Sequence, residues 1–165
     1  MAVALAEEWD SQHESIDLKT LHLNNFLAKC IRAANDDGLQ RYMREELYTI
    51  LENDQICYRE SESAENSYKS GLAKAQKEQT QRIFDIMEKH YGVHLNVFHD
   101  IASGPQHSSV CRVKPIIDTV DDYVLFSLYT VAQQSKSTSI ALAFLLRNDI
   151  SIKEAVDIAR VDENY

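Results

Sequence analysis

Two histidines four residues apart are the first place in this sequence where metal chemistry could occur. On a helix, His90 and His94 would share one face, as paired zinc ligands do. Gly92 lies between them, and a glycine there is typical of a helix end, which would turn the two imidazoles apart. Structural zinc needs about four converging ligands, and no cysteine pair accompanies these histidines. We therefore predict two surface histidines at a helix end, where a partial positive charge is favourable.

Cys57 is the candidate nucleophile, and Arg59 follows it by two residues. A catalytic cysteine needs a neighbouring base and an electropositive setting that lowers the thiol pKa. One arginine in an acidic chain gives little support to such a setting, so a packed thiol is the favoured interpretation. A thiol-dependent or metal-assisted hydrolase that uses Cys57 or the His90/His94 pair stays open as the alternative function.

A run of hydroxyl residues around a lysine, Ser135-Lys136-Ser137-Thr138, invites comparison with a phosphate-binding loop. Such a loop needs glycines that let backbone N–H groups approach the phosphates, and the GxxxxGK[ST] pattern is absent. The chain has 4 glycines in all, and none are clustered. No nucleotide or other cofactor is therefore expected, and the hydroxyls are interpreted as helix caps or as small residues that permit close helix packing.

Neighbouring carboxylates occur near both ends of the chain, and such pairs can perform acid–base catalysis. Near the start they are Glu7, Glu8 and Asp10, and near the end Asp162 and Glu163. Acid–base work needs one carboxyl in a dry cleft, whereas most such pairs form a solvated face. Asp162 and Glu163 are expected to close a helix, the end at which the helix dipole disfavours negative charge. We predict that the helix continues or that these acids face a basic partner.

The charge balance restricts the partners that the chain can have. It carries 26 acidic and 17 basic residues, a formal net charge of −9. This charge repels phosphate backbones and anionic lipids, so neither nucleic acid nor a membrane surface is expected as a partner. The longest apolar run, residues 140–146, is far shorter than the roughly 20 residues of a membrane span. Three cysteines without a CxxC pair indicate a reducing compartment.

The elements that must position these residues are predicted to be helices. Apolar residues recur at helical spacing over residues 2–12, 17–35, 39–51, 60–91, 111–120 and 122–132. Asp17 is predicted to cap the second of these helices, whose stripe should face the core: Leu23, Phe26, Leu27, Cys30, Ile31 and Ala34. The second and third helices should pack antiparallel because their connection is short. Residues 94–98 could form a short strand and residues 100–109 a loop.

The last thirty residues are predicted to form a helical hairpin around which the domain is organised. Its first arm, residues 140–146, is apolar on every side and should be a buried central helix. Its second arm begins with a capping box, in which Ser151 and Glu154 satisfy backbone donors of the first turn. The fold class expected overall is mainly α, a compact multi-helix domain with at most a minor short strand element.

Five sequence pieces, in this order, resemble a known family: the mitochondrial assembly chaperone specific for the alpha subunit of the ATP synthase F(1) sector. The pieces are Glu8-Trp9-Asp10, residues 54–59 (DQICYR), Tyr91-Gly92-Val93, Ser135-Lys136-Ser137 and residues 159–165 (ARVDENY). The resemblance spans nearly the whole chain, and residues 57–59 and 160–165 are its most specific parts.

This resemblance implies a protein that is not an enzyme. It implies binding of the unassembled alpha subunit, which is kept from aggregating until it pairs with the beta subunit, in the mitochondrial matrix. Arg160, Asp162 and Glu163 are the partner-binding residues that it implies, and a monomer is expected. The family has a β-rich N-terminal domain before its helical one. Residues 1–165 are therefore expected to be a single helical domain from the C-terminal part of a longer protein.

Overall fold

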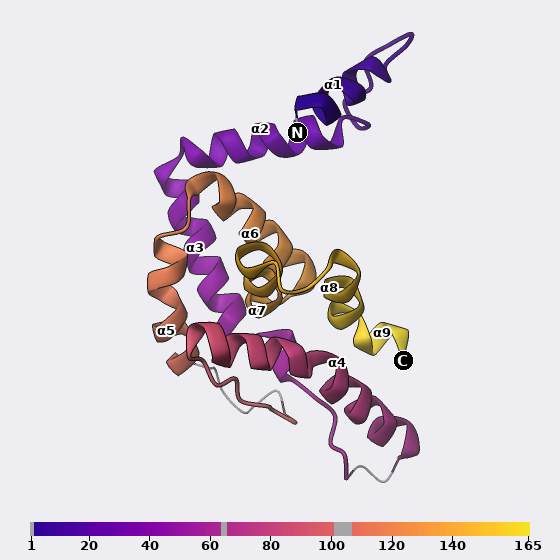
Figure 1. Ribbon diagram of the computed structural model, residues 1–165, viewed down its shortest axis with the longest axis vertical. Coiled ribbons are helices and arrows are strands. Elements are labelled where there is room, and N and C mark those ends of the chain that lie inside the picture. Colours follow the sequence, from indigo (N-terminus) through magenta and orange to yellow (C-terminus); the bar gives the residue numbers. More distant parts are fainter. Residues whose placement is uncertain (1, 64–65, 101–106) are drawn as a thin grey trace.

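The computed structural model describes residues 2–63, 66–100 and 107–165 (Figure 1). These residues form a mainly α-helical domain, as predicted. They contain no strand, and Tyr58 and Phe98 form an isolated parallel bridge. The elements are α1 (Ala2–Asp10), α2 (His22–Ala34), α3 (Asp37–Glu52), the 3₁₀ turn η1 (Gln55–Cys57), α4 (Ser67–Tyr91), α5 (His107–Asp118), α6 (Asp122–Ser135), α7 (Thr138–Ala141), the π-helical η3 (Leu142–Arg147), α8 (Ile152–Ala159) and α9 (Val161–Asn164).

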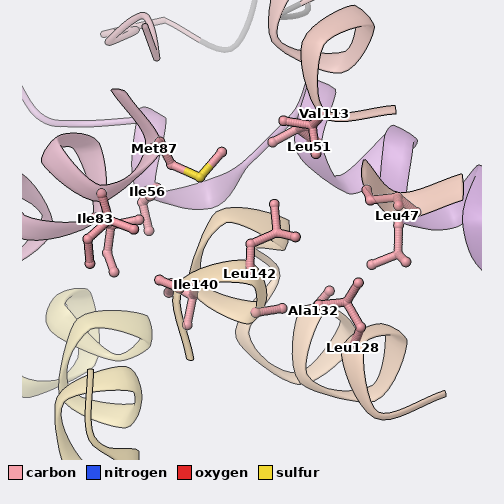
Figure 2. Packing of buried hydrophobic residues seen from close by; sticks show 14 of the residues in the cluster. Leu47, Leu51, Ile56, Ile83, Met87, Val113, Leu128, Ala132, Ile140 and Leu142 are labelled. Atoms are coloured by element: carbon pink, nitrogen blue, oxygen red, sulfur yellow. The ribbon is translucent and has the colours of Figure 1, made fainter. Parts of the chain in front are cut away.

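The continuous α7–η3 segment lies at the centre of the core, as the apolar run predicts. Ile140 and Leu142 are fully buried. Figure 2 shows Leu142 surrounded by side chains from other elements, among them Leu47, Met87 and Leu128. The prediction of a buried central helix is confirmed for residues 140–143, whereas residues 144–146 are only partly buried.

The expected start of the second helix is wrong. Asp17 accepts a hydrogen bond from the backbone N–H of Lys19, outside the helix (2.9 Å). The carboxylate of Glu8 instead reaches across from α1 and accepts from the N–H groups of Leu23 (2.7 Å) and Asn24 (3.0 Å) in the first turn of α2. Desolvation opposes ionisation of Glu8, but these backbone hydrogen bonds outweigh it and lower the pKa of Glu8. One member of the N-terminal acidic group is therefore a helix cap.

The apolar stripe of α2 is only partly in the core, which corrects the prediction. Cys30 and Ala33 are buried, but Leu23 and Ile31 are 45% and 47% exposed. The predicted antiparallel packing of α2 on α3 is also wrong, because α3 turns away from α2 and both helices pack against α6 (Figure 1). With α2 at one end of the molecule, part of its stripe has no element to cover it.

Helix α4 ends where the sequence predicts, and the segment after it differs from the prediction. Gly92 adopts the left-handed conformation (φ 63°), and its N–H caps the helix on Glu88. Residues 94–98 form no strand. Phe98 alone pairs with residues 57–59, donating to the backbone oxygen of Cys57 (2.7 Å) and accepting from the N–H of Arg59 (2.8 Å).

Helix α5 begins earlier than predicted, so Pro115 lies inside the helix and not near its start. Of the loop predicted over residues 100–109, residues 101–106 lie outside the described residues, and residues 107–109 belong to α5. No helix in the part of the chain that the structure describes is long and apolar enough to cross a membrane.

Candidate partner-binding surface

A buried carboxylate joins two sequence pieces that lie eighty residues apart. Asp54 is fully buried, and its two oxygens accept from the N–H groups of Ser139 (3.0 Å) and Ile56 (3.4 Å). Gln55 donates its N–H to the backbone oxygen of Lys136 (3.1 Å). Desolvation raises the pKa of Asp54 to about 6, although hydrogen bonds from Ser137 and Ser139 oppose the shift. Asp54 thereby ties η1 to the first turn of α7.

The hydroxyl run around Lys136 is structural, as the helix-cap interpretation predicts. Ser137 caps α7 by accepting from the N–H of Ile140 (3.0 Å). Thr138 donates to the backbone oxygen of Leu47 on α3 (2.8 Å), and Ser135 donates to that of Val131 (2.8 Å). The Ser137 hydroxyl caps α7, that of Thr138 joins α7 to α3, and that of Ser135 bonds within α6.

Cys57 is completely buried within the core cluster, so a substrate could not reach its sulfur atom. The structure therefore gives no support to a thiol-dependent hydrolase. It places Cys57 where the packed-thiol interpretation predicts.

His90 and His94 do not converge. The Nε2 atom of His90 lies 3.5 Å from a carboxylate oxygen of Asp149, and the Nδ1 atom of His94 lies 3.5 Å from one of Glu88. The left-handed turn at Gly92 separates the two imidazoles, as predicted. Among the described residues, no three His, Cys, Asp or Glu side chains are grouped so as to hold a metal ion.

The C-terminal arm differs from the single helix that the sequence predicts. The capping box of Ser151 and Glu154 is present, but α8 ends at Ala159 and a new short helix, α9, begins after Arg160. Asp162 and Glu163 are therefore the second and third residues of the single turn α9 (Val161–Asn164). The expectation of one continuous helix through these acids is wrong, because the chain breaks at Arg160 and Asp162 and Glu163 belong to a separate single turn.

The three residues implied as partner-binding are exposed and close together. The guanidinium of Arg160 donates to the carboxylate of Glu163 (2.7 Å), and both side chains are more than half exposed. Asp162 accepts from the amide of Gln76 on α4 (2.7 Å). The side-chain carbonyl oxygen of Gln76 accepts from the N–H of Glu60 (2.8 Å). Gln76 thus connects α9 with the segment that follows the Cys57-Tyr58-Arg59 piece.

Arg59 fixes the same segment to α4. It donates to the hydroxyl of Thr80 (2.7 Å), and its guanidinium lies 4.5 Å from the centroid of the Phe84 ring. Desolvation lowers the pKa of Arg59. Sequence reasoning missed the roles of Gln76 and Thr80. The available signal was that these two polar residues, four apart, continue the buried stripe of α4 that includes Leu72 and Ile83.

Tyr165 anchors the end of α9. Its ring packs against that of Tyr68, with centroids 5.3 Å apart. Its hydroxyl oxygen lies where a Cβ atom at Gly71 would be, only 1.8 Å from that ideal position. The absence of a side chain at Gly71 therefore lets the last residue sit directly on α4.

An apolar groove of about 280 Å³ lies between α6 and α8, and we call it the α6–α8 groove. Its walls include Val131 of α6, Ile140 and Phe144 of the α7–η3 segment, and Ile152 and Val156 of α8. Arg160 is the one charged residue in its lining within the described chain. Arg160 pairs with Glu163, whereas Asp162 faces Gln76 on α4 and does not line the groove.

Solved structures with a similar fold come from bacteria. Atp12 from Paracoccus denitrificans is 20% identical, with a TM-score of 0.79, 99% of this chain covered and 66% of that chain. An aspartate-to-lysine mutant of P. denitrificans Atp12p matches with 21% identity and the same TM-score and coverage. A chaperone candidate from Agrobacterium tumefaciens matches with 20% identity, a TM-score of 0.81, and coverage of 99% and 58%.

These matches show a shared fold, and this chain spans about two thirds or less of the length of those proteins. The sequence also matches a family model described as the ATP12 chaperone protein over residues 1–88, which is more than half of the 165 residues. The segment so matched includes Glu8, Asp54 and Arg59. On this match, the chain belongs to the ATP12 chaperone protein family.

Proposed function

We propose that this chain is an assembly chaperone for ATP synthase and that its client is the unassembled alpha subunit of the mitochondrial F(1) sector. It holds this subunit by surface complementarity, without catalysis, in the matrix, and releases it when the beta subunit arrives. The observation that carries the proposal is the family match over residues 1–88. The chain acts as a monomeric helical domain, the C-terminal part of a longer protein with a β-rich N-terminal domain.

The client contacts are assigned to Arg160, Asp162 and Glu163. These side chains are exposed, they lie together at the break between α8 and α9, and contacts to α4 hold α9 in place. A surface that is fixed yet exposed suits reversible binding, because little side-chain or loop entropy is lost when the client docks.

Co-expression of this chain with each subunit separately tests the proposal. We expect the chain to co-purify with the alpha subunit and not with the beta subunit, and to suppress light scattering by alpha alone. Equal recovery of both subunits, or of neither, would contradict the client specificity.

Replacing Glu163 by lysine should weaken alpha-subunit binding while leaving the fold intact. The substitution breaks the exposed ion pair with Arg160, and such pairs contribute only about 0–1 kcal/mol to stability. It also reverses a charge on the surface assigned to the client. Thermal unfolding and co-purification should be measured on the same preparation.

The matched control is Glu45→Lys, the same charge reversal at an exposed position of α3. If both variants weakened binding equally, the effect would come from the net charge and not from the surface at α9. If Glu163→Lys lowered the melting temperature strongly and left binding unchanged, Glu163 would be a structural residue.

A further inference from the structure

A pocket of about 400 Å³ lies on α4 beside α9, and we call it the α4–α9 pocket. Leu72 and Gln76 of α4 are 9% and 5% exposed and form its floor. Its lining also includes Tyr58, which follows η1, Phe98, which follows α4, and Asp162 of α9. The volume falls in the range of about 300–1,000 Å³ that is typical of ligand sites. Unlike the α6–α8 groove, this pocket has several charged groups that can select its occupant.

The charged groups of the α4–α9 pocket favour a cation. The described part of its lining contains one guanidinium, that of Arg59, and three carboxylates: Glu60, Asp100 and Asp162. The guanidinium is already engaged on α4, because it donates to the hydroxyl of Thr80 (2.7 Å) and lies over the Phe84 ring. The carboxylates outnumber it, so a bound anion would be repelled and a bound cation attracted.

Asp162 is the carboxylate best placed to bind this cation. Gln76 holds it by donating from its amide nitrogen (2.7 Å), while the amide oxygen accepts from the N–H of Glu60 (2.8 Å). Lys69 pairs with Glu60 (3.4 Å), whereas no lysine or arginine of the described ranges forms an ion pair with Asp162. The exposed carboxylate of Asp162 is therefore fixed in position without being neutralised.

The other groups of the pocket suit a planar guanidinium better than an ammonium. The rings of Tyr58 and Phe98 contact each other, with centroids 5.5 Å apart, and form an aromatic wall. His99 donates from Nδ1 to the backbone oxygen of Arg59 (2.9 Å), because a carbonyl oxygen can only accept, and in the neutral ring Nε2 is then an acceptor. A guanidinium stacks on aromatic rings and donates several hydrogen bonds in one plane, whereas an ammonium is a compact, strongly hydrated charge.

We infer that the α4–α9 pocket receives an arginine side chain of the client subunit. The guanidinium of that arginine donates to the carboxylate of Asp162 and packs against the aromatic wall, and its apolar stem lies on Leu72. This inference rests on the proposed function and adds to it the pocket and the chemistry of the bound group. Of the three residues assigned to the client, Asp162 lines this pocket, while Arg160 and Glu163 pair with each other outside it.

The pocket can be tested without the client. N-acetyl-L-arginine amide is titrated into the isotope-labelled chain, and NMR follows the backbone amides of residues 58–60 and the side-chain amide of Gln76. We expect saturable chemical-shift changes with a dissociation constant on the order of 1 mM, as for a ligand of this size. N-acetyl-L-lysine amide carries the same charge and should bind severalfold more weakly, because it cannot stack on the aromatic wall.

Asp162→Asn tests the role of the carboxylate. Asparagine keeps an oxygen that can accept from Gln76, so α9 should stay in place while the charge is removed. We expect binding of the arginine probe and of the alpha subunit each to weaken about tenfold, because a hydrogen bond to a charged acceptor is roughly twice as strong as one to a neutral acceptor.

The matched control is Asp85→Asn on the same helix, α4. Asp85 is exposed and accepts from the amide of Gln81 (2.8 Å), as Asp162 does from Gln76, but it does not line the α4–α9 pocket. This variant has the same net charge as Asp162→Asn. It should bind the arginine probe and the alpha subunit as the unmodified chain does.

Three results would overturn the pocket assignment while leaving the proposed function standing. The first is an arginine probe that causes no saturable shifts, or that binds no tighter than the lysine probe. The second is an equal loss of probe binding in Asp162→Asn and Asp85→Asn, since the loss would then follow the net charge. The third is unchanged alpha-subunit binding by Asp162→Asn. Failure of the unmodified chain to bind the alpha subunit would instead reject the proposed function, whatever the probe does.

Discussion

Replacing Leu142 by aspartate should prevent the domain from folding. Leu142 is fully buried at the centre of the core, among side chains of α3, α4 and α6 (Figure 2). An ionised carboxylate in this place would lie among apolar groups, at a cost of at least several kcal/mol. The free energy of unfolding of a whole domain is about 5–15 kcal/mol. We therefore expect the cooperative thermal transition, followed by circular dichroism, to be lost.

Two other variants separate a core effect from a general effect of charge. Leu142→Ala creates a cavity without a charge and should lower the free energy of unfolding by about 2–5 kcal/mol, leaving a folded protein with a lower melting temperature. Ile152→Asp places the same carboxylate at an exposed position and should melt close to the unmodified chain. If Leu142→Asp melted normally, Leu142 could not lie in the core.

The sequence predicts the central helix because residues 140–146 have no polar side, and only a buried position suits such a segment. It predicts the stripe of α2 less well. Helical periodicity identifies which residues share a face, but another element must be present to cover that face. At the end of the molecule α6 packs against part of α2, as in the Phe26–Phe126 ring contact, and leaves Leu23 and Ile31 exposed.

The candidate site shows the same division between local and long-range information. The capping box at Ser151 depends on residues three apart, and it is present as predicted. No glycine or proline marks the break at Arg160, so residue patterns predict α8 and α9 as one helix. The bond between Gln76 and Asp162 joins residues 86 apart, and residue spacing carries no information about such a contact.

Asp54 should make the stability of this domain fall as the pH rises from about 4 to about 6. Burial raises the pKa of this carboxyl from 3.8 to about 6. Between these values the unfolded chain has already released the proton, while the folded chain still holds it, so each pH unit costs the folded state about 1.4 kcal/mol. The loss from this group should total about 3 kcal/mol, and it should stop above pH 6, where both states are ionised.

Asp54→Asn should remove this dependence, because the amide does not titrate. Its oxygen can still accept from the N–H of Ser139, but the acceptor for Ile56 is lost, so the variant should be less stable by about 1–3 kcal/mol at pH 4. Urea unfolding of both proteins between pH 4 and 7 measures the difference in their free energies of unfolding. The other carboxyl groups contribute equally to both proteins, so their pH dependence cancels in this difference. We expect this difference to shift by about 3 kcal/mol in favour of the variant as the pH rises.

Leu142→Ala is the appropriate control for this pH series, because it destabilises the same core without altering an ionisable group. Its difference from the unmodified chain should stay constant over the window in which the Asp54→Asn difference changes. If the Asp54→Asn difference were also constant, Asp54 would be ionised throughout. The donors from Ile56, Ser137 and Ser139 would then outweigh the desolvation of the carboxylate, and the contact between η1 and α7 would be a charged cap that is most stable at neutral pH.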